Sequence, residues 1–486
     1  MRVDVNYRSV FRIIGLLMMV EGALMCLPLA VDFFCGASCW EGFAAGIAVS
    51  ALPGFLLYRF SGAGKGIYRR EGFVLVGFVW IIFSLSGMLP FVFSGPHLSV
   101  ADAFFETMSG FTTTGATVIQ GLESLPRSIL LWRALTQWIG GLGIIIFMLA
   151  VLPFLNENGG SSMYNAEITG MIRDRIHPRV HRTASTLWII YVIATAAEIL
   201  LLWAGPMDFF DAVCHSFTTV STGGFSTRDA SIAAWHSDYI AGVVTVFMFF
   251  GGVNFVLLRT LFSRGWRKAL DNDVLRAYAL IVALSAAAVL CVLLMRGEVR
   301  TLSDALLLPL FHVVSAITTT GFAYADFTVW GPFCLIVTLS LMLCGACAGS
   351  TTGAIKVDRV LALYRNMRNE LHSALYPRRI CAVRVGGNVV ASSELSRLMA
   401  FVTMYMLSVG IGALVTSAFG ISLTDSLFVS VTCLGNNGLG YGLTGVAGGF
   451  GLLPDAVKWV MSFLMLAGRL ELFSIVMMAF TVFSRK

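Results

Sequence analysis

The sequence predicts an all-α integral membrane protein in which four similar helix–pore loop–helix units surround a central pore, with two extra N-terminal transmembrane helices. Three observations support this fold class: an apolar composition, a series of membrane-length segments, and a polar motif that occurs four times. Of the 486 residues, 57% are hydrophobic and only 12% are charged, and the mean hydropathy is +0.83. Such a chain lacks the polar side chains that cover a water-exposed surface. The lipid bilayer is therefore its expected surroundings.

Ten apolar segments are long enough to cross the membrane, since about 20 helical residues span roughly 30 Å of hydrocarbon. They begin near Phe11, Glu41, Gly72, Ser128, Thr183, Asp238, Val274, Trp330, Arg397 and Pro454. Most of the 33 Lys and Arg residues then fall on one side, at both chain ends and in the loops 58–72, 156–182, 259–276 and 356–397. Positive residues beside a span resist translocation. Both termini are therefore predicted to be cytoplasmic.

The first two spans, in residues 1–60, form an extension that precedes the repeated part. The first span has no small-residue cleavage site after a short apolar core, so it is predicted to remain as an anchor. The ten cysteines lie mostly in apolar spans without paired spacing, which indicates packing residues. Whether Cys35 and Cys39, which lie at an outer loop, form an oxidised pair stays an open question.

A motif rich in Thr, Asn and Gly occurs four times, and internal repetition of this kind indicates a repeated structural unit. The copies are SGFTTTGAT at 109–117, FTTVSTGGFS at 217–226, SAITTTGFAY at 315–324 and TCLGNNGLGYG at 432–442. Each copy is expected on the outer side and follows an apolar stretch of about 10–13 residues, which is too short to cross the bilayer. These stretches are predicted to be re-entrant pore helices.

Aspartates set the register of the four copies. Thirteen residues separate the aspartate from the glycine in three units: Asp102 and Gly115, Asp211 and Gly224, Asp425 and Gly438. In the third unit Asp304 lies seventeen residues before Gly321, which predicts one inserted helical turn. Aspartate at this place is expected to cap the start of the pore helix and to suit the positive end of its dipole.

The second span of each unit has a glycine-rich middle, which allows close helix approach. The segments are Trp138–Gly143, Phe250–Asn254, Cys344–Gly349 and Ala467–Arg469. One such segment alone indicates simple helix packing, but four at matching distances indicate a repeated function. The units are predicted to span residues 72–155, 183–262, 274–356 and 397–483.

Irregular backbone at membrane depth suits a cation filter, because its unpaired carbonyls are tolerable only where they line or replace water. Glycine permits an extended run close to a shared axis, and rings of carbonyl oxygens can replace the hydration shell of K⁺. The C-terminal ends of four pore helices favour a cation at the same place. The residues expected to form the filter and to bind K⁺ through backbone carbonyls are Thr113, Thr114, Gly115, Thr222, Gly223, Gly224, Thr319, Thr320, Gly321, Asn436, Asn437 and Gly438.

Two questions about the filter stay open at this point. No copy carries the five-residue run TVGYG, so fewer carbonyl rings and poorer discrimination among K⁺, Rb⁺ and Na⁺ are expected. Gly223 competes with Gly224 for the second filter position, and Gly435 competes with Gly438 for the fourth. The aspartate spacing favours Gly224 and Gly438.

Five segments resemble the TrkH/TrkG branch of the bacterial TrkH/TrkG/KtrB superfamily of K⁺ transporters, and the resemblance covers essentially the whole chain. The segments are Asn6–Arg8, Ser221–Ser226, Thr318–Phe322, Gly349–Lys356 and Gly468–Phe473. The resemblance implies K⁺ uptake across the bacterial inner membrane without a covalent cofactor. It also implies filter glycines at Gly115, Gly224, Gly321 and Gly438, a homodimer with one pore in each protomer, and a cytosolic nucleotide-binding regulatory ring of the TrkA type.

Arg469 is the first of two candidate gates, since it lies in the middle of the last span. A cation inside hydrocarbon costs at least about 2.5–3.5 kcal/mol, so it should face water or a partner. Facing the pore, it would form a positive barrier below the filter. The alternative is a structural ion pair with Glu471 or Glu198.

The segment 345–356 is the second candidate gate. Glycines interrupt a helix that should continue, and hydroxyls can satisfy the released carbonyls. The break resembles the intramembrane loop that blocks the pore in the family. Its candidate gating residues are Gly345, Gly349, Ser350, Thr351, Thr352, Gly353 and Lys356. A phosphate-binding loop is the competing interpretation, but it lacks a preceding strand.

Polar residues within the pore helices have two interpretations. His215 and His312 occupy matching places, and Glu106 occupies the same place in the first unit. They are expected to support the pore loops by hydrogen bonds, with metal binding as the alternative. An enzymatic function is not expected, because the sequence shows no convergent set of catalytic groups. No nucleic-acid partner is expected either. A secondary symporter coupled to H⁺ or Na⁺ remains the competing function.

Overall fold

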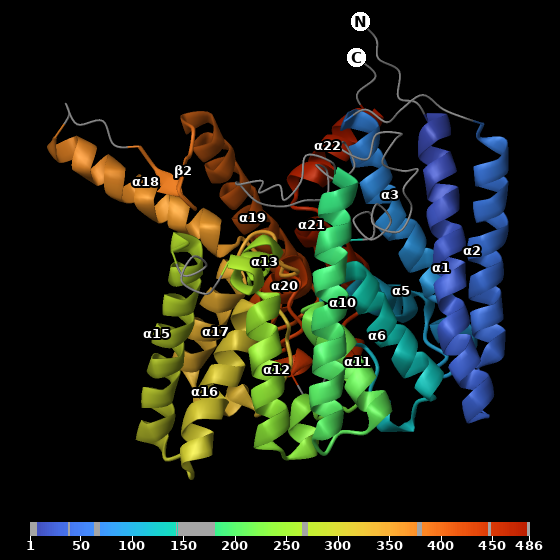
Figure 1. The fold of residues 1–486 in the computed structure, drawn as a ribbon, viewed down its shortest axis with the longest axis horizontal. Coiled ribbons are helices and arrows are strands. Elements are labelled where there is room, and N and C mark those ends of the chain that lie inside the picture. The colour runs from blue at the N-terminus through green and yellow to red at the C-terminus, as the bar shows by residue number, and fades with distance from the viewer. Residues whose placement is uncertain are drawn as a thin grey trace, which may run out of the picture.

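The computed structural model describes residues 7–36, 39–62, 69–141, 143, 180–264, 271–376, 382–445 and 449–483. Its helices stand roughly parallel in one body, with the hairpin of β1 (Arg384–Val385) and β2 (Asn388–Val389) at one end (Figure 1). The predicted loop 156–182 and the inner part of the first unit lie largely outside the described residues.

The N-terminal extension is a pair of packed helices, α1 (Tyr7–Cys35) and α2 (Trp40–Phe60). Gly15 and Gly54 lie at their crossing, where a Cβ on Gly15 would be 2.5 Å from the Gly54 carbonyl oxygen. The pair contacts the rest of the molecule through α3, α4 and α6 of the first unit. It therefore sits beside the repeated part, as expected from the sequence.

The four units follow one another along the chain, and each contributes four labelled helices. Unit 1 has α3 (Arg69–Gly87), α4 (Leu89–Phe93), α5 (Val100–Phe111) and α6 (Arg127–Gly141). Unit 2 has α10 (Val180–Ala204), α11 (Phe209–Val220), α12 (Asp238–Gly251) and α13 (Phe255–Arg264). Unit 3 has α15 (Asp273–Arg296), α16 (Leu302–Ile317), α17 (Pro332–Cys344) and α18 (Val357–Leu375). Unit 4 has α19 (Ser392–Ala418), α20 (Leu423–Gly435), α21 (Asp455–Arg469) and α22 (Phe473–Phe483).

Among the described residues, five short 3₁₀ helices lie in the connections after the pore helices. They are η1 (Leu122–Ser124), η2 (Ser231–Trp235), η3 (Phe327–Trp330), η4 (Gly442–Thr444) and η5 (Phe450–Leu452). The pore helices themselves are α5, α11, α16 and α20. Of these, α5 and α11 have 12 residues, α20 has 13 and α16 has 16, so the longer third pore helix agrees with the inserted turn predicted from Asp304.

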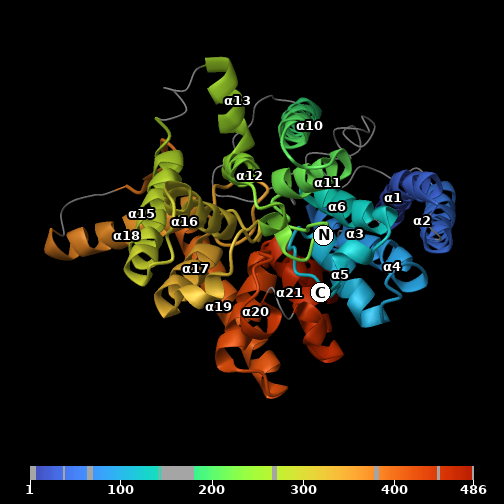
Figure 2. The ribbon, with the colours of Figure 1, turned by 90° about the horizontal axis from the view of Figure 1, so that it is seen from below.

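The units close into a ring around one centre. The second long helix of each unit packs against the pore helix of the next: α6 on α11, α12 on α16, α17 on α20 and α21 on α5. The last of these contacts joins unit 4 back to unit 1. Figure 2 shows the four pore helices and their partners arranged about this centre. The predicted fold class is confirmed.

Burial in this ring is polar inside and apolar outside. Thr112, Thr218 and Thr320 in and beside the central loops are fully buried, whereas Ile193 and Leu284 on the first helices of units 2 and 3 are more than 60% exposed. A water-soluble protein would show the opposite distribution. Exposed apolar faces around a polar centre fit a molecule surrounded by lipid.

The second spans are less continuous than expected. Among the described residues, six helices are long and apolar enough to cross a membrane, or seven if α21 and α22 count as one span bent by 103°. In unit 2 the chain breaks between α12 and α13, and in unit 3 it breaks over residues 345–356. The break over 345–356 was expected, whereas those after α12 and α21 were not; the glycine-rich middles end helices as well as allow close packing.

The role assigned to the pore-helix aspartates also needs correction. Their N-terminal caps are Ser99, Asp208, Thr301 and Ser422. The predicted aspartates lie three residues further on, where Asp304 accepts a hydrogen bond from the Thr301 N–H at 3.0 Å. They complete the first turn of each helix, which is a capping-box position in the third unit. In units 1, 3 and 4 the Ser or Thr hydroxyl provides the cap by accepting the N–H of this aspartate, whereas Asp208 makes no side-chain capping bond in unit 2.

Candidate functional site

The four pore loops, residues 112–117, 221–226, 318–323 and 436–441, begin with the same backbone turn. One residue near the start of each loop has a left-handed conformation. It is the second residue in the first three loops, where φ is 54° at Thr113, Thr222 and Thr319, and the first residue in the fourth, where φ is 52° at Asn436. The next N–H donates back to a helix carbonyl, as from Thr114 to Ser109 at 2.8 Å. This is a Schellman ending, and it turns the chain sharply away from each pore helix.

Threonine is an unusual residue for this turn. A β-branched side chain with positive φ is strained, and such strain persists only where the surroundings fix it. Glycine follows two residues later at Gly115, Gly224 and Gly321, with φ of 81°, 80° and 84°. Counting from Asn436 in the same way reaches Gly438. Gly435 instead ends helix α20, and Gly223 matches Thr114, so the shared turn gives the same alignment as the aspartates.

The aligned glycines meet one another around the centre. A Cβ on Gly115 would lie 2.1 Å from the Gly223 carbonyl oxygen, and one on Gly224 would lie 1.8 Å from the Thr320 carbonyl oxygen. A Cβ on Gly321 would lie 2.5 Å from the Gly438 nitrogen, and one on Gly438 would lie 2.9 Å from the Gly115 carbonyl carbon. The pore loops therefore touch in the order one, two, three, four and back to one, with backbone facing backbone.

Side-chain amides hold neighbouring pore loops in place. Asn436 Nδ2 donates to Thr114 Oγ1 at 3.0 Å and to the Met465 carbonyl at 2.9 Å. Asn437 Nδ2 donates to the Ala316 carbonyl at 2.8 Å. The two asparagines thus join the fourth loop to the first loop and to the third pore helix. Their amides make contacts that a threonine hydroxyl is too short to make.

Gln137 supports the second pore loop from helix α6. Its Nε2 donates to the Gly223 carbonyl at 2.8 Å, and its Oε1 accepts from the Phe225 N–H at 3.0 Å. The side chain is fully buried. One face of the loop is therefore held by a two-way amide bridge from the neighbouring unit. The sequence analysis missed Gln137, although a glutamine inside an apolar span was a usable signal.

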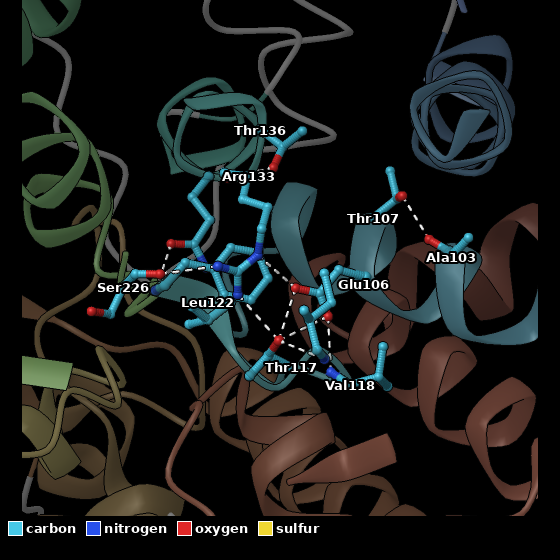
Figure 3. A network of polar contacts seen from close by, with 12 residues as sticks. Ala103, Glu106, Thr107, Thr117, Val118, Leu122, Arg133, Thr136 and Ser226 are labelled. Atoms are coloured by element: carbon cyan, nitrogen blue, oxygen red, sulfur yellow. Dashed lines mark hydrogen bonds and ion pairs between the residues drawn. The ribbon is translucent and has the colours of Figure 1, made fainter. Parts of the chain in front are cut away.

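A buried ion pair lies behind the first two pore loops (Figure 3). Arg133 Nε and Glu106 Oε1 are 2.8 Å apart, and both side chains are at most 1% exposed. Glu106 also accepts from Thr117 Oγ1 in the first loop and from the N–H of Val118 directly after it. Arg133 donates to the Ser226 carbonyl in the second loop at 3.0 Å. The pair therefore links two pore loops through both of its ends.

The two pore-helix histidines are hydrogen-bonded supports. His215 contacts the Asp211 carbonyl at 2.8 Å and Ser226 Oγ at 3.0 Å, while His312 Nε2 lies 2.7 Å from Thr338 Oγ1. No group of three potential His, Cys, Asp or Glu ligands occurs among the described residues. Ser226 joins the His215 contact to the Arg133 contact, so it connects the supports of units 1 and 2.

The intramembrane loop, residues 345–356, lies against the inner ends of the pore loops. Thr222 Oγ1 donates to Thr351 Oγ1 at 3.1 Å, and the Gly353 N–H donates to Thr319 Oγ1 at 3.0 Å. A Cβ on Gly353 would lie 2.3 Å from the Gly435 carbonyl oxygen. The intramembrane loop thus touches units 2, 3 and 4 directly beneath their pore loops.

Hydroxyls within this loop replace part of the missing helix hydrogen bonding. Ser350 Oγ donates to the Cys347 carbonyl and pairs with Thr352 Oγ1 at 2.8 Å. Gly345 and Gly349 have φ of 70° and 75°, and Lys356 reaches 83° immediately before α18. Four of the seven candidate gating residues therefore shape the loop itself, while Thr351 and Gly353 join it to the pore loops. Lys356 is buried at its inner end.

Arg469 lies at the bend between α21 and α22 and reaches across the centre. Its guanidinium donates to the Thr351 carbonyl at 2.7 Å and to the Gly140 and Gly141 carbonyls of α6, the latter at 2.8 Å. It thus joins the intramembrane loop to unit 1. Glu471, one of its two predicted ion-pair partners, instead lies 2.5 Å from Arg359 Nη2.

These features define the class of protein: a multi-pass membrane protein in which four pore loops from one chain meet around a shared centre. A family model described as "TrkH: Cation transport protein" matches residues 40–484. The chain therefore belongs to the TrkH family of cation transport proteins, which are membrane transport proteins and not enzymes. The expected family is confirmed.

Named relatives match along almost their full length. The Trk system potassium uptake protein TrkH of Escherichia coli (strain K12) is 36% identical over 487 residues, covering 99% of this chain and 100% of that protein. The Trk system potassium uptake protein TrkG of the same organism is 32% identical, covering 97% and 98%. The crystal structure of the potassium transporter TrkH from Vibrio parahaemolyticus matches with a TM-score of 0.86 and 34% identity, covering 97% and 98%.

Proposed function

We propose that this chain takes up K⁺ through a channel-like pore lined by the four pore loops. The observation that carries the proposal is the closed circle of backbone contacts that runs from Gly115 to Gly223, from Gly224 to Thr320, from Gly321 to Gly438 and from Gly438 back to Gly115. These four segments lie far apart in the sequence, yet they share one turn and each contacts the next, as expected for segments around a shared axis. The names of the relatives, potassium uptake proteins and a potassium transporter, support K⁺ as the ion.

The filter in this proposal is made of backbone carbonyls. Its residues are Thr113, Thr114, Gly115, Thr222, Gly223, Gly224, Thr319, Thr320, Gly321, Asn436, Asn437 and Gly438. The Schellman turns already satisfy the last helix carbonyls, and this leaves loop carbonyls available to an ion, apart from the Gly223 carbonyl, which accepts from Gln137. The negative ends of four pore helices point toward the same centre and favour a cation there. Each unit supplies one quarter of the filter, with the proposed boundaries 72–155, 183–262, 274–356 and 397–483; helix α18 continues unit 3 beyond the third of these boundaries.

Gating in this proposal depends on the intramembrane loop and Arg469 together. The loop lies beneath the filter, and the guanidinium that holds its Thr351 carbonyl adds a positive charge below the ion path. At an effective dielectric constant of about 20, two unit charges 4 Å apart interact by about 4 kcal/mol. Opening would require the loop and Arg469 to move away together. Arg469→Ala is therefore expected to raise the Rb⁺ flux of the folded protein, and an unchanged flux would count against the barrier.

The setting follows from charge placement and family resemblance. We place the protein in the bacterial inner membrane with both termini in the cytoplasm, as a homodimer beside a nucleotide-binding regulatory subunit of the TrkA type. Helix α1 begins at the end of the molecule where α22 lies (Figure 1), which supports placing both ends on one side. There the inside-negative potential would favour K⁺ entry by about 2.3 kcal/mol per 100 mV.

Ion-coupled symport is the second candidate function. Purified protein in liposomes, with a K⁺ gradient and no H⁺ or Na⁺ gradient, tests both functions through the uptake of isotopic Rb⁺. Uptake under these conditions supports the channel-like mechanism. Uptake that requires an imposed H⁺ or Na⁺ gradient would replace it with symport.

Glycine substitutions test the filter itself. Gly224→Ser and Gly438→Ser are expected to abolish rescue of K⁺-limited growth in a transport-deficient bacterium, because the new side chains would collide with the neighbouring pore loop. Gly242→Ser and Gly410→Ser are matched controls, since a Cβ at either position meets no atom within 4 Å. Normal rescue by both filter variants, at equal expression, would remove the pore loops from the ion path.

A further inference from the structure

Gln137 occupies a position that the other three units fill with methionine. The position lies three residues before the glycine at the inner end of each second long helix: Gln137 before Gly140, Met248 before Gly251, Met342 before Gly345 and Met465 before Gly468. All four side chains are fully buried. The alignment agrees with two tyrosine contacts, since Tyr191 and Tyr278 donate to the carbonyls directly after Gln137 and Met248. A buried amide needs hydrogen-bond partners, whereas a buried methionine does not.

Gln137 takes its partners from the second pore loop, where Gly223 leaves room for it. Its Nε2 donates to the Gly223 carbonyl at 2.8 Å, and its Oε1 accepts from the Phe225 N–H at 3.0 Å. A Cβ on Gly223 would lie 2.4 Å from both Cδ and Oε1 of Gln137. Gly223 also lacks the positive φ of Gly224. Glycine is therefore required at 223 because the glutamine fills the space of a side chain there.

The matching residues of the other pore loops carry side chains, and they are Thr114, Thr320 and Asn437. Among the described residues, none of their three carbonyls accepts a hydrogen bond. In the fourth loop Asn437 replaces half of the glutamine bridge, because its Oδ1 accepts from the Leu439 N–H at 3.1 Å. Its Nδ2, however, donates to the Ala316 carbonyl of a pore helix. Within the described part of the chain, the side-chain bond to a carbonyl at this level is therefore particular to the second loop.

A hydrogen bond to a filter carbonyl changes what that carbonyl offers to an ion. The amide proton of Gln137 uses one of the two lone pairs of the Gly223 oxygen, and it holds this oxygen toward unit 1. Discrimination between K⁺ and Na⁺ depends on the number and field strength of the carbonyl dipoles around the ion, and fewer dipoles favour the smaller ion.

We infer that Gln137 is a specificity-determining residue of the proposed filter, on which this inference rests. It acts through Gly223: three carbonyls at this level bind K⁺ fully, and the bonded fourth contributes less. The glutamine thus fixes the second pore loop and at the same time limits the preference of the filter for K⁺ over Na⁺.

Exchange of the Gln137 and Gly223 pair tests the inference. Gln137→Met with Gly223→Asn gives the second loop the residues of the fourth, so that an asparagine oxygen accepts the Phe225 N–H and the carbonyl at 223 is released. The K⁺ and Na⁺ affinities of the purified full-length protein are measured from the rise of its unfolding temperature with each salt, at an ionic strength kept constant with choline chloride. The K⁺ to Na⁺ affinity ratio should rise about fivefold, the factor that corresponds to one net hydrogen bond. An unchanged or lower ratio would overturn the inference.

The reverse exchange separates this effect from a general loss of structure. Met248→Gln with Thr320→Gly builds the same bridge onto the third pore loop and should lower the affinity ratio. If the first exchange does not fold, this pair decides, and an unchanged ratio here would overturn the inference. Met248→Leu is the matched control, because it keeps an apolar side chain at the position, and it should keep the wild-type ratio. An equal change in this control would show that packing alone sets the ratio.

The affinity ratio does not depend on the mode of transport, so this test is independent of the one for the proposed function. Wild-type liposomes that take up Rb⁺ only under an imposed H⁺ or Na⁺ gradient would overturn the channel-like mechanism. A raised affinity ratio in the exchanged protein would still support the role of Gln137.

Discussion

At the scale of single residues, a small number of buried polar side chains set the distances between pore loops. Glu106 and Arg133 are the clearest case, because one bonds the first loop and the other bonds the second. The matching positions of units 2 and 3 carry His215 and His312, which bond neutral groups. The four units therefore share a turn but differ in the side chains behind it, so the pore is only approximately fourfold.

Breaking the Glu106–Arg133 pair is expected to loosen the filter. Glu106→Gln leaves the Arg133 charge buried and unpaired, which should lower the free energy of unfolding by about 3–5 kcal/mol. Because the pair links two pore loops, the K⁺ to Na⁺ permeability ratio measured in liposomes should also fall. Glu106→Gln combined with Arg133→Met should recover much of the stability but not the selectivity, since no charge is then left unpaired.

The exposed ion pair of Asp271 and Arg276 provides the control for the variants of Glu106 and Arg133. Asp271→Asn should change the free energy of unfolding by less than about 1 kcal/mol, as is usual for surface pairs, and should leave selectivity as in the wild type. A Glu106→Gln variant that keeps its permeability ratio while losing stability would show that the pair supports the fold and not the filter.

At the scale of elements, the molecule depends on helices that end where continuous helices were expected. Helix α12 ends at Gly251, α17 at Cys344 and α21 at Arg469, all near the inner ends of the pore loops. Gly140 and Gly468 lie so close to pore-helix ends that a Cβ would fall within 2 Å of a carbonyl oxygen of Phe111 or Leu434. Glycine thus lets the pore-helix ends approach the second helix of a unit closely, and it also weakens that helix at the same position.

Thr351→Val tests how firmly the intramembrane loop is held. The hydroxyl accepts from Thr222 and reaches the Val220 and Gly251 carbonyls, both at 3.3 Å. Losing one net hydrogen bond costs about 1 kcal/mol, which is roughly a fivefold change in the balance between closed and open loop. Rb⁺ flux should rise by about this factor, while the Thr351 carbonyl still accepts from Arg469.

Ser340→Ala is the matched control for this loop variant, because Ser340 is exposed and its hydroxyl bonds only within α17, to Ile336. Its flux should equal that of the wild type. A fall in flux for Thr351→Val, with normal folding, would mean that the hydroxyl keeps the path open and that the loop is not a blocking gate.

At the scale of the whole molecule, closure of the ring depends on contacts between units far apart in sequence. On the outer face, Tyr324 after the third pore loop donates to Asp238 at the start of α12, at 2.8 Å. Asp238 also accepts from Ser303 at the start of α16. Units 2 and 3 are therefore joined at their outer edge as well as at the filter.

This outer contact predicts a loss of stability at high pH. Partial burial, together with the bond to Asp238, raises the pKa of Tyr324 to about 12. The folded protein favours the protonated phenol, so the contribution is complete below the ordinary tyrosine pKa of about 10 and is lost as pH rises toward 12. Thermal unfolding from pH 8 to 12 should show a steeper decline for the wild type than for Tyr324→Phe. Parallel curves would contradict the prediction.

Features that depend on nearby residues were accessible from the sequence. Apolar length and the repeated Thr-Thr-Gly motif predicted the membrane fold, and the longer gap after Asp304 predicted the extra turn of α16. The glycine-rich middles predicted close packing, but only the third was expected to break. Arg133 and Gln137 were missed, because their partners Ser226, Gly223 and Phe225 lie about ninety residues away, and no spacing rule connects them.

The sequence by itself determined that the chain enters lipid and that it contains four related segments, and its aspartate spacing favoured Gly224 and Gly438, because hydropathy, repetition and spacing are local properties. Only the tertiary structure decided which unit neighbours which and that Arg469 holds the Thr351 carbonyl. Those facts depend on ring closure, which brings together groups from all four units, and a linear pattern does not encode the distances between them.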